Sequence, residues 1–185
     1  MSNNLLPRIF RYFNKFFMVP LFRLGLGPFV GNPITGYIMV LKTTGRKTGK
    51  TRFTPTNYTI RDGIVYWAAG FGARTHWLLN IQANPQVEIL LPGRSISGAA
   101  EVVADPEEST EMLWWVLKDA GVPGFFAGFN PYTISKEEFK IKTEDLTVLR
   151  LRKRGITKGP FDAGGWFWLV MLAGSLAIVY LLLSR

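Results

Sequence analysis

The chain has 185 residues with 22 Lys or Arg and 13 Asp or Glu, so its formal net charge is +9 with the single histidine neutral. The absence of cysteine excludes disulfides, thiolate catalysis and cysteine-ligated metal or iron–sulfur sites, and one histidine excludes a multi-histidine site, so we expect no bound metal. Residues 1–61 hold ten basic residues and no acidic one. This asymmetry predicts an anionic partner, and composition leaves lipid headgroups, a phosphorylated cofactor and nucleic acid open.

The N-terminal segment, residues 1–33, begins with an amphipathic helical pattern. At about 100° per residue, apolar side chains fall on one arc about 140° wide and basic side chains on the opposite side. The apolar arc holds Leu5, Ile9, Tyr12, Phe13, Phe16 and Phe17, and the basic side holds Arg8, Arg11 and Lys15. This pattern is typical of a helix lying in a membrane interface. The alternative is a helix that packs its Phe side chains on the domain, and the pattern alone does not separate the two.

Residues 34–152 are expected to form one compact α+β domain around a small antiparallel barrel of five or six strands. Asp62-Gly63 predicts a hairpin turn, and Pro55 predicts an edge or a bulge. Asp105 as N-cap and Pro106 at the first helical position predict the start of a helix. The predicted strands cover 36–43, 52–61, 64–69, 87–91, 95–104 and 146–152, and the predicted helices cover 76–83 and 105–120.

The C-terminal residues 163–184 carry no charge and span roughly 33 Å as a helix, enough to cross a bilayer core of about 30 Å. Trp166, Phe167 and Trp168 at one end and Tyr180 near the other are placed as at membrane interfaces. We therefore predict a linker over 153–163 and a single transmembrane anchor over 164–184; the alternative is a buried core helix. Five basic residues precede the span and one follows it, so we expect residues 1–160 in the cytoplasm and the C-terminus outside.

A basic, glycine-containing turn lies at 43–52, with the sequence TTGRKTGKTR. It is not a nucleotide-triphosphate loop, because Gly45 and Gly49 are separated by three residues rather than four and a strand follows. Its cationic side chains are suited to holding a phosphate tail by charge-assisted hydrogen bonds, and the alternative is a solvated hairpin turn. A second glycine-rich stretch, 68–74, follows the third predicted strand, so the two loops can converge on one ligand.

The combination of LKTTGRKTGKTRFTPTNY, RDG and VYWAAGFGARTHWLLNIQANPQVEI resembles the deazaflavin-dependent nitroreductase and quinone reductase family over roughly 36–152. The resemblance implies a split β-barrel with flanking helices that binds reduced 8-hydroxy-5-deazaflavin, coenzyme F420. It also implies hydride transfer to quinones, nitro compounds or other unsaturated acceptors. The C-terminal span has no counterpart in this resemblance.

The resemblance implies fifteen cofactor-binding residues and assigns no catalytic residue. Arg46, Lys47 and Thr48 match the phosphate-binding turn, Arg52, Thr54, Pro55 and Asn57 match the strand that lines the cofactor, Ala68, Ala69, Gly70, Phe71 and Gly72 match the loop under the ring, and Trp77, Asn80 and Ile81 match the flanking helix. Ala69 departs from the family pattern, in which a serine is common. Tyr132 is the only candidate near the position of the substrate tyrosines.

Other residues have two interpretations each. His76 is a candidate general acid, although a hydrogen-bonded structural role is favoured. Trp114 and Trp115 are candidates for a cofactor wall, although a place in the core or on a surface facing the barrel is favoured. Glu107, Glu108 and Glu111 are most simply a solvated first helical turn.

The hypothesis that accounts for these features is a membrane-anchored oxidoreductase that passes hydride from the deazaflavin to a lipophilic acceptor such as a quinone. Its expected partners are the lipid bilayer and the acceptor, with a homodimer also open. The alternatives are a non-catalytic split-barrel subunit of a membrane complex, and a binder of another planar cofactor, flavin mononucleotide (FMN) or haem. Nucleic-acid binding is not expected, because the basic residues suit a turn and a lipid-facing helix better than a groove-reading element.

Overall fold

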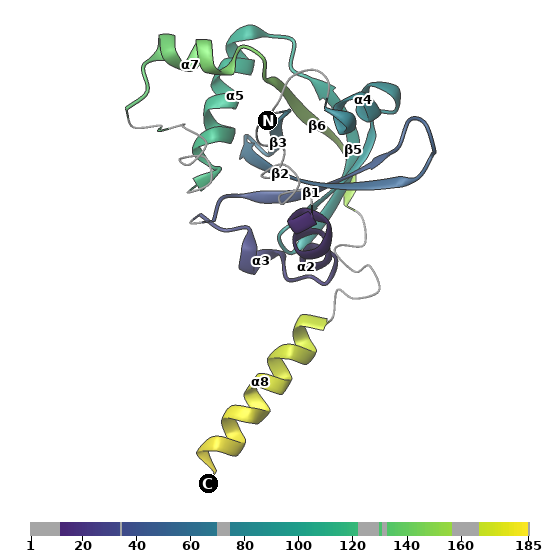
Figure 1. The fold of residues 1–185 in the computed structure, drawn as a ribbon, viewed down its shortest axis with the longest axis vertical. Coiled ribbons are helices and arrows are strands. Elements are labelled where there is room, and N and C mark those ends of the chain that lie inside the picture. Colours follow the sequence, from purple (N-terminus) through teal and green to yellow (C-terminus); the bar gives the residue numbers. More distant parts are fainter. Residues whose placement is uncertain are drawn as a thin grey trace, which may run out of the picture.

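A computed structural model describes residues 12–33, 35–69, 75–121, 130, 133–156 and 167–184. Its centre is a closed antiparallel barrel with the strand order β1-β2-β3-β6-β5-β4 (Figure 1). The strands are β1 (Ile38–Thr44), β2 (Thr51–Arg61), β3 (Ile64–Ala69), β4 (Gln86–Leu91), β5 (Arg94–Val102) and β6 (Thr147–Ile156). The predicted α+β class and the predicted barrel of about six strands are confirmed.

Short helices surround the barrel. They are η1 (Asn14–Met18), α2 (Val19–Arg23), α3 (Gly27–Val30), α4 (His76–Ala83), α5 (Pro106–Lys118), α7 (Lys136–Thr143) and α8 (Phe167–Leu183). Helix α7 was not predicted. Its sequence is largely charged, and only Phe139 and Thr143 are buried, so it lacks an apolar stripe. A start signal was present nonetheless, because the Ser135 side chain accepts a hydrogen bond from the Glu138 N–H at 3.1 Å.

The barrel core follows from the alternation of side chains along each strand. Met39 and Leu41 of β1 point into the barrel, and Val40 between them packs on the N-terminal helices instead. The other fully buried inward side chains include Trp67, Ala69, Ile89 and Leu149. Helix α4 adds Leu78 and Ile81 to the same core. The position of α4 matters for function, because its exposed and polar groups lie beside the basic turn.

The pairing of strand β2 explains why a proline is tolerated at position 55. This strand pairs with β1 from Thr51 to Asn57, and its pairing with β3 begins only at Tyr58. Pro55 lies opposite Val40, in the half of β2 that has a single strand neighbour among the described residues. A proline lacks the N–H that a second neighbour would need, so the predicted edge position is confirmed.

Strand β6 continues beyond its predicted end at residue 152, so the predicted linker 153–163 starts too early. Gly155 pairs with Ser97 and Lys153 pairs with Gly98, with a register shift between these two positions of β5. A Cβ added to Gly98 would lie 2.3 Å from the carbonyl oxygen of Arg152. The glycine therefore permits the close approach of the two backbones at this irregularity.

Helix α8 occupies most of the predicted transmembrane anchor. It covers residues 167–183, and residues 164–166 of the predicted anchor lie outside the described residues. Within the described part of the chain, no helix is long and apolar enough to cross a membrane. The prediction of a transmembrane helix over 164–184 is therefore not supported. The alternative of a buried core helix is wrong, because side chains 172–184 are exposed.

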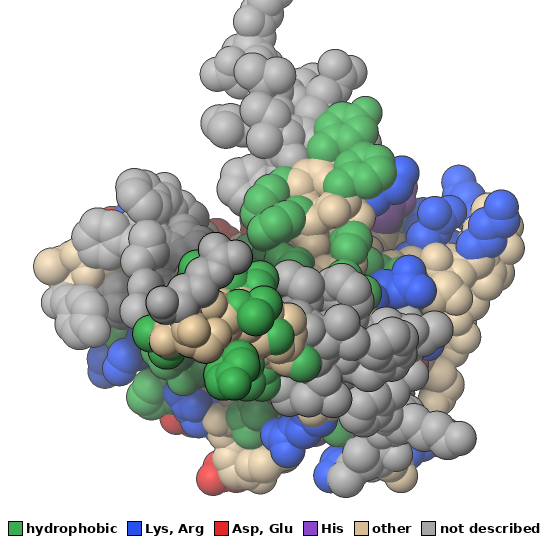
Figure 2. Space-filling view, turned by 90° about the horizontal axis from the view of Figure 1, so that it is seen from below, with side chains coloured by type: hydrophobic (Ala, Val, Ile, Leu, Met, Phe, Trp, Pro, Cys, Tyr) green, Lys and Arg blue, Asp and Glu red, His purple; other side chains and the backbone are tan. Residues whose placement is uncertain are grey.

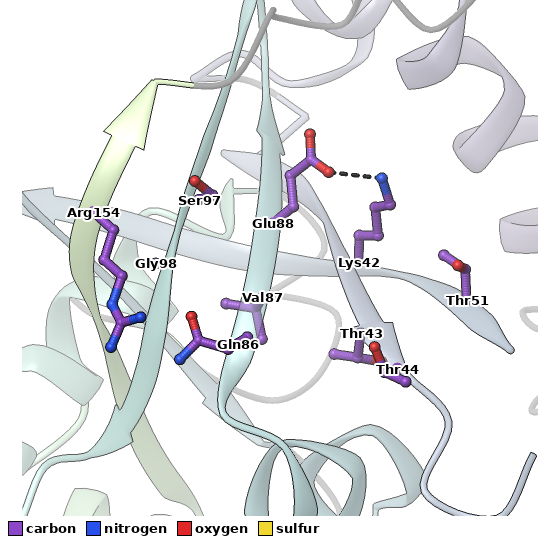
Figure 3. A pocket seen from close by; sticks show the side chains of 10 residues that line it. All are labelled: Lys42, Thr43, Thr44, Thr51, Gln86, Val87, Glu88, Ser97, Gly98 and Arg154. Carbon is purple, nitrogen blue, oxygen red and sulfur yellow. Dashed lines mark hydrogen bonds and ion pairs between the residues drawn. The ribbon is translucent and has the colours of Figure 1, made fainter. Parts of the chain in front are cut away.

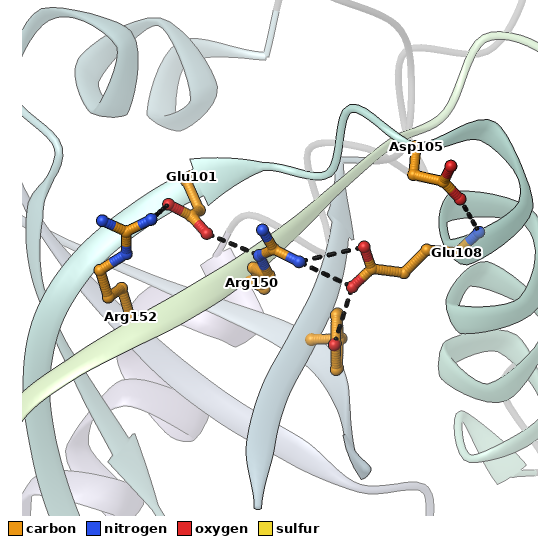
Figure 4. A network of polar contacts seen from close by, with 6 residues as sticks. Glu101, Asp105, Glu108, Arg150 and Arg152 are labelled. Atoms are coloured by element: carbon orange, nitrogen blue, oxygen red, sulfur yellow. Dashed lines mark hydrogen bonds and ion pairs between the residues drawn. The ribbon is translucent and has the colours of Figure 1, made fainter. Parts of the chain in front are cut away.

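A charged cluster attaches α5 to the barrel (Figure 4). Arg150 of β6 donates from Nε to Glu101 at 2.6 Å and from Nη1 to Glu108 at 2.8 Å. The Tyr66 hydroxyl donates to the same Glu108 carboxylate at 2.9 Å, and burial followed by this hydrogen bond raises the pKa of Tyr66. The hydrogen bonds to Glu101 and Glu108 raise the pKa of Arg150. Glu108 was expected to be solvated, and it is instead the link between helix and sheet.

We expect Arg150→Leu to lower the free energy of unfolding by about 2 kcal/mol, because it leaves the half-buried Glu108 carboxylate without its counter-charge and Glu101 with only the exposed Arg152. The loss stays below that of a fully buried pair, since these side chains are about one third exposed. Arg152→Leu is the matched control, because its side chain is 73% exposed and its one ion pair, to Glu101 at 3.0 Å, contributes about 0–1 kcal/mol. Urea unfolding of both variants measures the difference, and equal losses would contradict the assignment.

Candidate cofactor-binding site

The basic turn between β1 and β2 is fastened to α4. The backbone N–H of Arg46 donates to Oδ1 of Asn80 at 3.1 Å, and Nη1 of Arg46 donates to the same oxygen at 3.3 Å. Nη1 also donates to the carbonyl oxygen of His76 at 3.4 Å. Asn80 is only 7% exposed, so its amide is a fixed acceptor rather than a mobile surface group. The structure thus brings together Arg46 and Asn80, which the sequence placed in separate elements of the site.

Backbone hydrogen bonds hold the same turn from within. Gly45 donates to the carbonyl of Lys50 at 2.9 Å, and Thr48 and Gly49 both donate to the carbonyl of Gly45. Gly49 has φ of +65°, a conformation that favours glycine. These backbone hydrogen bonds shape the turn, so the side chains of Lys47, Lys50 and Arg52 remain available for a ligand.

The cationic side chains of this turn point to solvent. Lys47, Lys50 and Arg52 are exposed, and none of them forms an ion pair within the described ranges of the chain. Their positive charge is not neutralised by neighbouring carboxylates. A preformed loop that carries several unneutralised cations is suited to an oligoanionic ligand.

The four predicted residues of β2 do not share one surface. Arg52 and Thr54 lie on the face that continues into the barrel, since Thr54 pairs with Leu41. Pro55 and Asn57 lie on the opposite face. Asn57 donates to the carbonyl of Tyr37 at 3.4 Å, which is a structural contact. We expected all four to line the cofactor, and alternation along the strand separates the two pairs.

Two of the five residues predicted to lie under the ring, Ala68 and Ala69, are among the described residues. Ala69 is 0% exposed and lies in the barrel core, whereas Ala68 packs towards α5. Gly70, Phe71 and Gly72 lie outside the described residues. Trp77 and Ile81 are buried in the same core as Ala69. These buried residues support the position of α4, and Asn80 is the member of this helix that reaches the basic turn.

A hollow of about 240 Å³ lies at the base of the basic turn (Figure 3). Its lining residues come from β1, β2, β4, β5 and β6, and none of the fifteen predicted residues is among them. Lys42 and Glu88 point toward each other in its lining, and Nζ of Lys42 donates to Glu88 at 2.7 Å. The sequence offered no signal for this pair, because the two residues are 46 positions apart and only strand pairing places them opposite each other.

Thr43 lines the same hollow and has a polar atom without a partner. The side chain is 3% exposed, and Oγ1 has no hydrogen-bond partner among the described residues. Such a group usually has a partner in a folded protein, so a ligand or a water molecule is the expected one. Thr43 pairs with Arg52 across the β1–β2 ladder, which joins the hollow to the basic turn.

The structure also places the remaining candidates that it describes. The side chain of His76 is exposed, and its carbonyl oxygen is the group that accepts from Arg46. Trp114 packs edge-on against Phe139 with ring centroids 5.3 Å apart. Trp115 lies under Arg61, whose Cζ is 4.0 Å from the ring centroid. The favoured interpretation of both tryptophans as structural residues is confirmed, and Tyr132 lies outside the described residues.

Comparison with known proteins identifies the family to which this chain is similar in sequence. Residues 22–127 match the F420H(2)-dependent quinone reductase family. The chain belongs to this family. The match spans α3, the basic turn, α4, α5 and the strands β1 to β5, and it confirms the resemblance seen in the sequence. It follows that the chain is an oxidoreductase and that its cofactor is coenzyme F420, as predicted.

Solved structures of similar fold include three with informative names. A 5-nitroimidazole antibiotic resistance protein from Bacteroides thetaiotaomicron is 14% identical with a TM-score of 0.49, over 65% of this chain and 75% of that one. An F420-H2 dependent reductase is 24% identical with a TM-score of 0.37, over 62% and 93%. An F420 reductase is 18% identical with a TM-score of 0.44, over 70% and 93%. These scores are all below 0.5, so the family assignment rests on the match over residues 22–127.

The described residues of this F420-dependent reductase fit an anionic cofactor tail. The cations of the basic turn match phosphate and carboxylate oxygens in charge, and Asn80 holds the turn in place before any ligand arrives. The unpartnered Oγ1 of Thr43 adds a polar group next to the turn. The described residues of the basic turn that could hold such a tail are Arg46, Lys47, Thr48, Lys50 and Arg52.

Proposed function

We propose that this chain transfers hydride from reduced F420 to a quinone or another lipophilic unsaturated acceptor, nitro compounds included. The observation that carries the proposal is the preorganised cationic turn, fixed by Asn80 and free of neighbouring carboxylates within the described residues. F420 supplies the hydride when it is bound. The protein therefore has to bind, orient and shield, and it needs no nucleophile of its own.

Each part of the site has one task in this proposal. Lys47, Lys50 and Arg52 donate charge-assisted hydrogen bonds to the cofactor tail. Arg46 is held by Asn80 and keeps the turn at a constant distance from α4. Because α4 is anchored in the barrel core by Trp77 and Ile81, the tail is held relative to the whole barrel. Such positioning lowers the entropic cost of the transfer.

The acceptor class is supported by the apolar surface beside the barrel. Aromatic side chains of the N-terminal helices, Phe13, Phe16 and Phe17 among them, are exposed rather than packed in the core. A quinone that gains the hydride takes up one proton from water and becomes a hydroquinone. The exposed rings offer a lipophilic molecule contacts that a water-soluble acceptor does not need.

The test uses the purified full-length chain in detergent. We expect reduced F420 to bind with a dissociation constant below about 100 µM, equivalent to roughly −5.5 kcal/mol, and to be oxidised when a menaquinone analogue is added. F420 fluorescence follows binding, and F420 absorbance follows oxidation. No binding in this range, or binding without oxidation, would count against the proposal. The absorption spectrum of protein from its native source distinguishes F420 from FMN and haem.

A positioning variant sharpens this test. Asn80→Ala removes the acceptor that holds Arg46 without changing any charge, so we expect binding about 3–30-fold weaker, as for one or two hydrogen bonds. Gln82→Ala, at an exposed position of the same helix, is the control and is expected to bind like the parent. Thermal unfolding of both variants shows whether the fold is kept. Equal affinity of the two variants would contradict the role of Asn80.

A further inference from the structure

The N-terminal helices divide their apolar residues between two surfaces. Met18, Val19 and Phe22 are buried against Val40 and Leu90 of the barrel. The rings of Tyr12, Phe13, Phe16, Phe17 and Phe29 instead remain 47–74% exposed. Of the two alternatives left open by the sequence, docking of the Phe face on the domain is therefore wrong for residues 12–17. We call these five exposed rings the aromatic patch.

Four rings of the aromatic patch contact one another in pairs. Tyr12 stacks on Phe16 with centroids 6.1 Å apart, and Phe13 lies 4.9 Å from Phe17. Basic side chains flank them. Nζ of Lys15 lies 5.0 Å from the centroid of Phe16, and Arg23 is exposed at the end of α2. Aromatic rings next to cations match the boundary between headgroups and acyl chains of an anionic membrane.

Helix α8 is a second exposed apolar surface. It contains no charged residue, and its side chains from 172 to 183 are exposed on every side of the helix. The large exposed side chains are Leu172, Leu176, Ile178, Val179, Tyr180, Leu181, Leu182 and Leu183. A partner protein covers one stripe of a helix, so an all-round apolar surface points to a lipid phase as the occupant.

The two surfaces lie at the same end of the molecule. Helices α2 and α3 lie on the side of the barrel from which α8 projects, and α5 and α7 lie on the far side (Figure 1). The view from the α8 end shows hydrophobic side chains gathered on this face, with Lys and Arg side chains beside them (Figure 2). One flat lipid surface can therefore contact both at once.

We propose that the aromatic patch and α8 together bind the surface of an anionic phospholipid membrane. The side chains of α8 enter the acyl region, the rings of the patch lie at the headgroup boundary, and Lys15 and Arg23 contact phosphates. This binding needs neither cofactor nor acceptor, so its test is independent of the proposed reaction. It would place the barrel next to the phase in which a lipophilic acceptor dissolves.

Flotation of the full-length chain with vesicles tests this surface. We expect binding to vesicles of phosphatidylcholine mixed with phosphatidylglycerol, and weaker binding to phosphatidylcholine alone. The double variant Phe16→Ser, Phe17→Ser should lower the partition coefficient by at least about 30-fold. Both rings are exposed in the free protein, and burying each of them in the membrane contributes to the free energy of binding. The double variant Lys15→Ala, Arg23→Ala should lower it about 30-fold on anionic vesicles, and little on neutral ones.

Ile141→Ser is the matched control, because Ile141 is 75% exposed on α7, on the far side of the barrel. It should bind vesicles within twofold of the parent, because a single exposed apolar residue outside the aromatic patch does not form a membrane-binding surface. Circular dichroism confirms that each variant is folded. Unchanged flotation of the Phe16, Phe17 variant, equal binding to neutral and anionic vesicles, or a stable oligomer in place of vesicle binding would overturn the proposal.

Discussion

Reversing the charge of both Lys47 and Lys50 to glutamate is expected to weaken binding of F420 by at least about 100-fold. A hydrogen bond to a charged group contributes about 1.5–3 kcal/mol, and two such bonds are replaced by repulsion. The turn itself should survive, because Gly45, Thr48 and Gly49 form it through backbone hydrogen bonds and both lysines are exposed. Fluorescence titration of the full-length double variant measures the change.

A control with the same change in net charge separates the effect of charge at the basic turn from the effect of the net charge of the protein on F420 binding. Lys136→Glu with Lys140→Glu alters two exposed lysines of α7, which lies away from the basic turn. This control should bind F420 within a few-fold of the parent at physiological salt, where the screening length is about 8 Å. Similar losses in the two double variants would show that the basic turn does not hold the tail.

The second large effect concerns folding. We expect Gly36→Ala to lower the free energy of unfolding by about 3 kcal/mol or more, because it combines strain with a clash. Gly36 has φ of +93°, and an added Cβ would lie 2.2 Å from the carbonyl oxygen of Ala120. This contact joins the entry of β1 to the end of α5, where the N–H of Tyr37 donates to the carbonyl of Asp119 at 2.8 Å.

Gly63→Ala is the control for the strain alone. Gly63 has φ of +75°, and an added Cβ there meets nothing within 4 Å among the described residues. We expect it to cost about 1–2 kcal/mol, so the difference between the two variants reports the close approach at Ala120. At roughly 2–4 °C per kcal/mol for a chain of this size, thermal unfolding resolves the two. Equal midpoints would contradict the contact.

Local signals in the sequence were sufficient for most elements. The helix at 76–83 and the strand at 64–69 were predicted with the bounds that the structure has. Asp62 and Gly63 form the predicted turn, with φ of +51° and +75°. Such features depend on a few adjacent residues, so propensity and turn chemistry predict them. Helix α7 was missed because Phe139 is its only buried apolar residue.

The sequence identified candidate components of the site, and the structure shows which of them meet. The basic turn and α4 were identified as its components, but the fastening of Arg46 to Asn80 was not, since it joins residues 34 positions apart. Asn57 was assigned to the cofactor by resemblance, and the alternation of β2 turns it towards Tyr37 instead. Glu108 was read as a solvated residue of a helix start, and it bonds Arg150 from β6 across 42 positions.

The sequence by itself determined the chemistry of this protein: a cationic glycine turn, an apolar C-terminal segment, no cysteine, and the motifs that place it in its family. These properties depend on residue type and short spacing, which folding does not change. Only the tertiary structure decided which groups meet, such as Lys42 with Glu88, and which remain uncovered, such as the aromatic patch. The physical reason is that strand register and helix docking set distances between residues far apart in the chain, and local propensity carries no information about those distances.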